Sequence, residues 1–164
     1  MDKVAEFIRI TKKLNEMDII PLLMGSVGLE VVTGEDWDAQ DLDIHVPGDE
    51  RGWEAPPKLS IHNWEKIVEI MISIGYTLVD LHEHEFSNGE LSVEFGIMDT
   101  LPEFAGVPLE DLEIHQEGDI KYYLLTKSQY LAVYEASSLD SYRADQNNNK
   151  DLRKIDFLKG VIDK

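Results

Sequence analysis

The tripeptide Ser87-Asn88-Gly89 is the feature that most constrains how this 164-residue chain folds. Asn-Gly between two segments of alternating polar and apolar residues is typical of a tight β-hairpin turn. The flanking segments are 76–86 and 90–98. We therefore expect a sheet that contains at least one antiparallel pair of strands.

Apolar residues at spacings of three and four predict amphipathic helices on both sides of this hairpin. The first covers 2–17, with Asp2 as its cap and an inner stripe of Val4, Phe7, Ile8, Thr11 and Leu14. A short helix over 27–32 is closed by Gly34. Ser60 is expected to cap another helix, whose inner face is Ile61, Trp64, Ile67, Val68, Met71 and Ile74.

The C-terminal part predicts a pair of helices. Thr126 caps one over 127–141, a polar break follows at 146–149, and the second covers 150–162 with Leu152, Ile155, Leu158 and Ile162 in register.

Short apolar or alternating segments complete the expected sheet. The run 19–24 reads as a buried strand, 41–46 as a strand with one buried face, and a further strand lies at 111–116 or 119–125. Prolines and glycines make 47–57 and 99–109 loops. The pattern predicts an α/β (α+β) fold, a small mixed sheet flanked by helices with a C-terminal helical pair. A chain of this length predicts a single domain over 1–164, with a core to about 125 and helices over about 126–164.

Composition excludes several function classes. The chain has no cysteine, so disulfides and thiolate chemistry are absent. Its net charge of −18 favours solubility and disfavours nucleic-acid phosphates, which bind through Lys and Arg. The charged N-terminal segment lacks a signal-peptide core, and no apolar run approaches the roughly 18 residues that span a membrane. We expect a cytoplasmic protein without a membrane partner.

The segment 41–46 places two carboxylates on one face of a strand. Leu42, Ile44 and Val46 form its apolar face, whereas Asp41, Asp43 and His45 form the other. Residues two apart lie about 6.6 Å apart along a strand, so the carboxylates repel each other unless solvent or a cation intervenes. Mg²⁺ or Mn²⁺ with its oxygen ligands would relieve this repulsion. The alternative interpretation is a solvated strand edge.

Glu94 is the third carboxylate of interest. It alternates with Val93 and Phe95 and so lies opposite the apolar face of its strand. If this strand lies beside 41–46 with the apolar faces aligned, Glu94 comes next to Asp41 and Asp43. Three such carboxylates could hold two metal ions about 3.5–4 Å apart, an arrangement that suits in-line displacement at phosphorus.

Gly25-Ser26 follows the apolar strand and begins a predicted helix. Backbone N–H groups at a helix N-terminus bind anions, glycine lets a phosphate approach, and the serine hydroxyl is a further donor. The alternative is that Gly25 only forms a turn and Ser26 only caps the helix.

Together, the helix, the apolar strand with Gly25-Ser26, the short helix and Asp41-Leu42-Asp43 resemble the nucleotidyltransferase superfamily. Thr33-Gly34 is similar to the Thr-Gly that frequently precedes the acidic strand in this superfamily. The segment 150–158, Lys-Asp-Leu-Arg-Lys-Ile-Asp-Phe-Leu, is similar to a helix of many small bacterial members, including those of the aminoglycoside and lincosamide type. The resemblance implies the nucleotidyltransferase fold. It further implies that Gly25 and Ser26 contact nucleotide phosphates. Asp41 and Asp43 would bind Mg²⁺ or Mn²⁺, and Glu94 would match the third carboxylate, a metal-site residue that activates the attacking hydroxyl.

The implied activity is metal-dependent transfer of a nucleoside monophosphate from a nucleoside triphosphate to an acceptor hydroxyl, with release of pyrophosphate. A small-molecule acceptor is favoured over nucleic acid, and a cationic one suits the acidic surface. The alternative is a catalytically weak or inactive nucleotide-binding regulatory module, such as an antitoxin-like partner. Candidate cations for the triphosphate are Lys127, Arg143, Lys150 and Arg153, each of which also reads as a solvated helix charge.

Three further features bear on function. His82 and His84 could share a strand face and bind a metal, but without a third ligand we favour an exposed hairpin strand. Trp64 reads as core, whereas Trp37 and Trp53 lie in loops and could stack on a base or an acceptor. No nucleophile-elbow motif supports a hydrolase triad.

Overall fold

The computed structural model describes the backbone of residues 2–139 and 141–162, and the side chains of 2–52, 54–138 and 151–162. Its main helices are α1 (Lys3–Asn15), α2 (Gly25–Thr33), α3 (Pro57–Ser60), α4 (Trp64–Ser73), α5 (Leu101–Ala105), α6 (Lys127–Leu139) and α7 (Ser141–Ile162). Its strands are β1 (Leu22–Met24), β2 (Leu42–Val46), β3 (Thr77–Asp80), β4 (Glu85–Ser87), β5 (Ser92–Ile97), β6 (Glu113–Glu117) and β7 (Ile120–Leu124).

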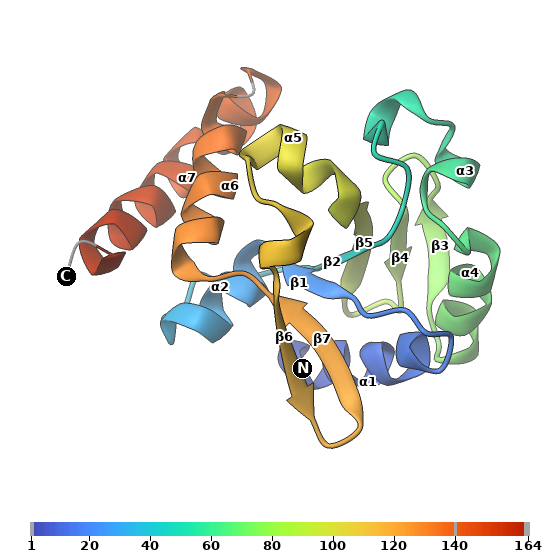
Figure 1. Cartoon of the computed structure of the whole chain (residues 1–164). Helices are drawn as coiled ribbons and strands as arrows, with labels where there is room; N and C mark the ends of the chain where they lie inside the picture. The colour runs from blue at the N-terminus through green and yellow to red at the C-terminus, as the bar shows by residue number, and fades with distance from the viewer. Residues whose placement is uncertain (1, 140, 163–164) are drawn as a thin grey trace.

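The strands form one mixed seven-stranded sheet in the order β3-β4-β5-β2-β1-β7-β6 (Figure 1). The central strand β2 pairs antiparallel with β1 and parallel with β5. On the other side of β1, β7 is parallel and forms a hairpin with the edge strand β6. The predicted mixed sheet with flanking helices and a C-terminal helical pair is confirmed.

Two apolar cores lie on opposite faces of this sheet. Phe7, Ile10 and Leu14 of α1 pack with α4 and with the inward residues of β2 and β5. The second core joins β1 and α2 to α5, α6 and α7, which lie on the other side of the sheet in Figure 1. Because the polar faces of β2 and β5 point away from the first core, their carboxylates face the side on which the C-terminal helices pack.

Three predicted helix ends are observed. The Asp2 side chain accepts a hydrogen bond from Ala5 N at 3.1 Å, and Gly34 ends α2 in the left-handed conformation. Thr126 Oγ1 accepts from Gln129 N at 3.2 Å, while Gln129 Oε1 accepts from Thr126 N at 2.9 Å. This reciprocal pair is a capping box, which satisfies two N–H groups at the start of α6.

The two segments predicted as loops, 47–57 and 99–109, contain helical turns: a 3-10 helix at Gly52–Glu54 and the helix α5. Ser60 ends the short helix α3 rather than capping the next one, because Pro57 suits a first helical turn and α4 begins only at Trp64. Within 99–109, the helix α5 has Pro102 in its first turn and Gly106 as a left-handed C-cap. Both candidate segments near 111–125 are strands, β6 and β7.

The segment 76–86 is not one strand. It forms β3 and β4 with a turn over 81–84, in which His84 adopts a φ of 51°. His84 is buried; its Nε2 donates to Pro57 O at 2.7 Å, and its ring lies 4.7 Å from that of Trp64. The prediction of an exposed strand for His82 and His84 is therefore wrong, because His84 links this turn to α3 and α4.

The ends of the chain depart from the predicted stripes. Helix α7 runs through 146–149 without a break. Its buried residues include Asp151, Lys154, Ile155 and Leu158, whereas Leu152 is 44% exposed and Ile162 is 36% exposed. In α1, Val4 is 40% exposed, whereas Ile10 is buried.

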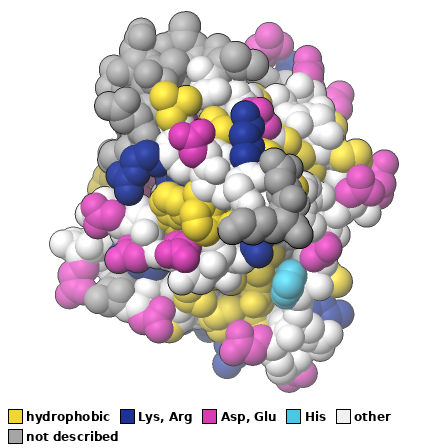
Figure 2. Space-filling model, turned by 90° about the vertical axis from the view of Figure 1, so that its left-hand side faces the viewer, with side chains coloured by type: hydrophobic (Ala, Val, Ile, Leu, Met, Phe, Trp, Pro, Cys, Tyr) yellow, Lys and Arg dark blue, Asp and Glu magenta, His cyan; other side chains and the backbone are white. Residues whose placement is uncertain are grey.

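Within the described residues, no helix combines the length and apolarity needed to cross a membrane. Figure 2 shows acidic side chains scattered over the face on which α2 and α7 lie.

Candidate functional site

The turn between β1 and α2 requires glycine at position 25. Gly25 has a φ of +67°, which side chains of L-amino acids rarely adopt. A Cβ atom there would lie 3.0 Å from Asp43 Cβ and 3.4 Å from Asp43 Oδ2. The N-cap position is Met24, so Ser26 lies inside the first turn and is not the N-cap. Glycine therefore lets the N-terminus of α2 approach Asp43 closely.

The carboxylates come together through the parallel pairing of β2 and β5. Asp43 is the register partner of Glu94, and Asp41 directly precedes β2. Along β2, Leu42, Ile44 and Val46 are fully buried, while Asp43 and His45 are partly exposed on the opposite face. Glu94 therefore lies beside the acidic strand, as expected. The roles of these three residues remain predictions.

Burial and mutual repulsion perturb this group of carboxylates. Burial, followed by the negative charges of Asp43 and Glu85, raises the pKa of Glu94 to about 7. The pKa of Asp41 is also raised, first by burial and then by Glu85 and Asp43. A cation placed here would favour the charged carboxylates, because an opposite charge lowers a carboxyl pKa.

Two of these carboxylates, Asp41 and Asp43, are the residues that could hold a divalent cation. In the part of the chain that the structure describes, no group of three or more Asp, Glu, His or Cys side chains is placed to hold a metal. Mg²⁺, however, commonly binds one or two carboxylates and completes its shell with water and substrate phosphates. Asp41 and Asp43 suit that mode; a ligand role for Glu94 stays a prediction.

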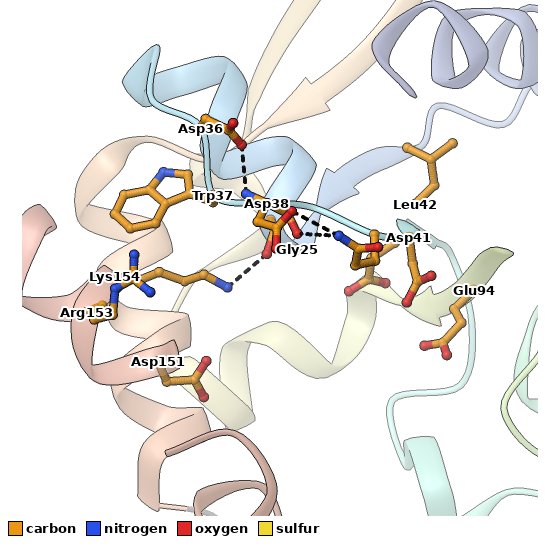
Figure 3. A pocket seen from close by; sticks show the side chains of 13 residues that line it. Gly25, Asp36, Trp37, Asp38, Asp41, Leu42, Glu94, Asp151, Arg153 and Lys154 are labelled. Carbon is orange, nitrogen blue, oxygen red and sulfur yellow. Dashed lines mark hydrogen bonds between the residues drawn. The ribbon is translucent and has the colours of Figure 1, made fainter. Parts of the chain in front are cut away.

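A cleft of about 530 Å³ joins these carboxylates to the glycine-serine turn and to α7. Figure 3 shows Arg153 and Lys154 on one side of this main cleft and Asp41 and Glu94 on the other. The remaining described lining residues are Gly25, Ser26, Asp36, Trp37, Asp38, Gln40, Leu42, Asp43 and Asp151. All five predicted site residues therefore line one space.

Lys154 is the functional candidate that the sequence analysis missed. It is 7% exposed, and its Nζ donates to Ser26 Oγ at 2.8 Å. The same ammonium lies 4.9 Å from the centroid of the Tyr134 ring. One pattern could have revealed it: Asp151, Lys154 and Leu158 are spaced by three and four residues, as the inward face of a helix requires.

Of the four cations proposed for the triphosphate, the structure describes the side chains of two, Lys127 and Arg153. Arg153 lines the main cleft, whereas Lys127 is exposed at the start of α6 and is not among its lining residues. The side chains of Arg143 and Lys150 lie outside the described residues, as does that of Trp53.

Trp37 lines the main cleft, and hydrogen bonds fix its position. Its backbone N donates to Glu30 Oε2 at 2.8 Å, and its indole Nε1 donates to Thr33 Oγ1 at 3.1 Å. Its ring meets that of Phe157 edge to face at 5.3 Å. Trp64, by contrast, is buried in the first core as predicted.

His45 lies against Asp43 on the polar face of β2. Its Nε2 is 3.3 Å from Asp43 Oδ1. A Cβ atom at Gly96, the register partner of His45 on β5, would lie 2.5 Å from that nitrogen. Glycine at position 96 therefore leaves the space that the imidazole occupies.

Comparisons with known proteins agree with this fold. The chain is similar to the crystal structure of an antigenic nucleotidyltransferase-like protein from Paracoccidioides brasiliensis, with a TM-score of 0.61 and 15% identity over 98% of this chain and 77% of that one. The protein thus has a nucleotidyltransferase-like fold. It is also 42% identical to the "Uncharacterized protein YnaI" of Bacillus subtilis (strain 168) over 96% of each chain. The chain belongs to the family of YnaI. No protein-family model matches it.

Proposed function

We propose that this protein is a metal-dependent nucleotidyltransferase that transfers a nucleoside monophosphate from a nucleoside triphosphate to the hydroxyl of a small-molecule acceptor. One observation carries the proposal: a single cleft brings together a helix N-terminus, a buried lysine and the acidic residues of two paired strands.

The triphosphate would lie over the Gly25-Ser26 turn. The N–H groups at the start of α2 and the partial positive charge of the helix favour an anion there. Lys154 donates to the Ser26 hydroxyl, and its ammonium would bind a phosphate oxygen at this turn. Arg153 adds a second cation at the same side of the cleft, and Trp37 offers its ring to the base.

Asp41 and Asp43 would hold the metal ion. Mg²⁺ or Mn²⁺ bound there would neutralise charge on the phosphates and on the departing pyrophosphate.

Glu94 would take the proton of the acceptor. The acceptor oxygen forms a bond to the α-phosphorus, the bond from that phosphorus to pyrophosphate breaks, and the hydroxyl proton passes to the Glu94 carboxylate. A general base works best when its pKa lies near the operating pH. Without a cation the pKa of Glu94 is about 7, and a metal ion bound beside it would lower that pKa toward its ordinary value.

A second candidate function is a regulatory module that binds the nucleotide without transfer. It is favoured by the absence, among the described residues, of a three-carboxylate cluster. Such a module would bind triphosphate and Mg²⁺ but would label no acceptor.

Calorimetry with a non-hydrolysable nucleoside triphosphate and Mg²⁺ tests the site. Lys154→Met keeps the apolar stem and removes the charge, and we expect roughly 10- to 100-fold weaker binding, the range for a charge-assisted hydrogen bond. Lys159→Met, on the same helix but at an exposed surface ion pair with Glu135, is the matched control and should bind as the wild type does. Equal affinities for all three proteins would contradict this phosphate site.

A further inference from the structure

A second cavity, of about 240 Å³, adjoins the main cleft at Gly25 and Asp43. It lies where α5 and α6 pack beside the ends of β1 and β2, and Figure 1 shows these two helices next to each other. Gly25 and Asp43 are the residues that the two spaces share. A molecule in this second cavity would therefore reach the reacting centre from the side of Asp43 and His45.

The lining of the second cavity differs in chemistry from that of the main cleft. It is largely apolar and aromatic, with Met24, Leu101, Phe104, Tyr130, Val133 and Tyr134. Thr100, Ser137 and His45 supply polar atoms, and Asp43 is its carboxylate. None of the described residues that line it is Lys or Arg, whereas Arg153 and Lys154 line the main cleft. This cavity therefore suits an uncharged group better than a phosphate.

The size of the cavity sets the size of the ligand. An apolar cavity of about 150 Å³ takes up benzene. A space of about 240 Å³ accommodates one or two rings and is too small for a whole nucleoside triphosphate. Tyr130 keeps one wall in place, because its hydroxyl donates to Leu23 O at 2.7 Å.

We propose that the second cavity binds the acceptor, and that this acceptor is a small molecule without negative charge, with an aromatic or alicyclic ring that carries a hydroxyl. This inference rests on the proposed function. The ring would pack against Phe104 and Val133, and the hydroxyl would face Asp43 at the shared opening. The acceptor oxygen then reaches the α-phosphorus from this opening, pyrophosphate leaves through the main cleft, and Glu94 takes the hydroxyl proton.

Titration of the ¹⁵N-labelled full chain with phenol and 2-naphthol, without nucleotide, tests occupancy. The amide signals of Thr100, Leu101 and Val133 should shift. Phe104 is 46% exposed, so Phe104→Ala should spare the fold while weakening ring binding by roughly two- to tenfold, the range for an aromatic contact. Ile114→Ala, at a 53% exposed position on β6, is the matched control and should bind like the wild type.

Three results would overturn the proposal. The first is the absence of shifts at these amides, and the second is equal affinity of the Phe104→Ala and Ile114→Ala variants. The third is competition between 2-naphthol and a saturating non-hydrolysable triphosphate with Mg²⁺, because the cavity would then belong to the nucleotide. Simultaneous binding of both supports it. Failure of the triphosphate to bind at all would refute the proposed function, whereas the titration without nucleotide still decides whether the cavity takes a ring.

Discussion

Replacing Glu94 by Gln should stabilise the metal-free protein, and the gain should increase from pH 5 to pH 8. The pKa of this carboxyl is about 7 in the folded protein, against 4.5 as its ordinary value. Between these two values the folded state binds a proton that the unfolded state has lost. The wild type therefore loses stability as the pH rises through this window, and the loss is complete above pH 7. Glutamine carries no charge at any of these values.

The magnitude follows from the size of the pKa difference. The rise from 4.5 to about 7 corresponds to a limit of about 3 kcal/mol. Glu94 is only half-buried, so solvent screening reduces the expected gain at pH 8 to about 1–2 kcal/mol. For a chain of this size that is a rise in Tm of roughly 2–8 °C.

Urea denaturation in EDTA at pH 5 and pH 8 measures the effect, with Glu69→Gln, at an exposed position on α4, as the control. The difference between Glu94→Gln and wild type should be small at pH 5 and large at pH 8. A gain of equal size at both pH values, or a Glu94→Gln protein less stable than wild type at pH 8, would refute the reasoning.

Two further predictions concern packing and metal binding. Gly28→Ala should cost about 2–4 kcal/mol in urea denaturation, because its Cβ would collide with Tyr130 Oη and lie 2.8 Å from Leu23 O. Gly160→Ala, where a Cβ meets no atom within 4 Å, should instead stabilise α7 by about 0.5–1 kcal/mol; equal effects would show that the Tyr130 contact is unimportant. Mg²⁺ or Mn²⁺ should raise the Tm of the wild type, and Asp41→Asn with Asp43→Asn should abolish that rise. Equal metal binding by the two proteins in calorimetry would exclude these carboxylates as the site.

The elements around the site were predictable because their patterns are local. Alternation along 41–46 and 91–97 is enough to predict which side chains face the core, and burial along β2 and β5 follows it. The proximity of Glu94 to Asp43 was conditional, because it depends on a parallel pairing between strands about 50 residues apart in the sequence. No local pattern specifies that partner.

The contact of Lys154 with Ser26 and the unbroken course of α7 were beyond local reasoning. The contact of Lys154 with Ser26 joins residues 128 positions apart, so it depends on how α7 packs on the turn after β1. The break predicted at 146–149 came from the weak helix propensity of asparagine. That penalty is a few tenths of a kcal/mol per residue and is readily outweighed by tertiary packing, here of Ile155 and Leu158 in the same helix.

His84 is a second case in which distant contacts outweigh a local pattern. Alternating residues over 81–85 predicted a strand, but the buried hydrogen bond to Pro57 O and the contact with Trp64 hold a turn there. Distant partners thus decided the local conformation.

The most direct test of the central claim is transfer of label from an α-³²P-labelled nucleoside triphosphate, with Mg²⁺, to hydroxyl-bearing ring compounds such as 2-naphthol and to a wider acceptor panel. The wild type should form a labelled product, and Glu94→Gln should lower the rate by roughly 10²–10⁴-fold while binding the nucleotide with similar affinity. Tight nucleotide binding by the wild type without transfer to any acceptor would contradict the enzymatic account and favour the regulatory module. Undiminished transfer by Glu94→Gln would exclude this carboxylate as the base.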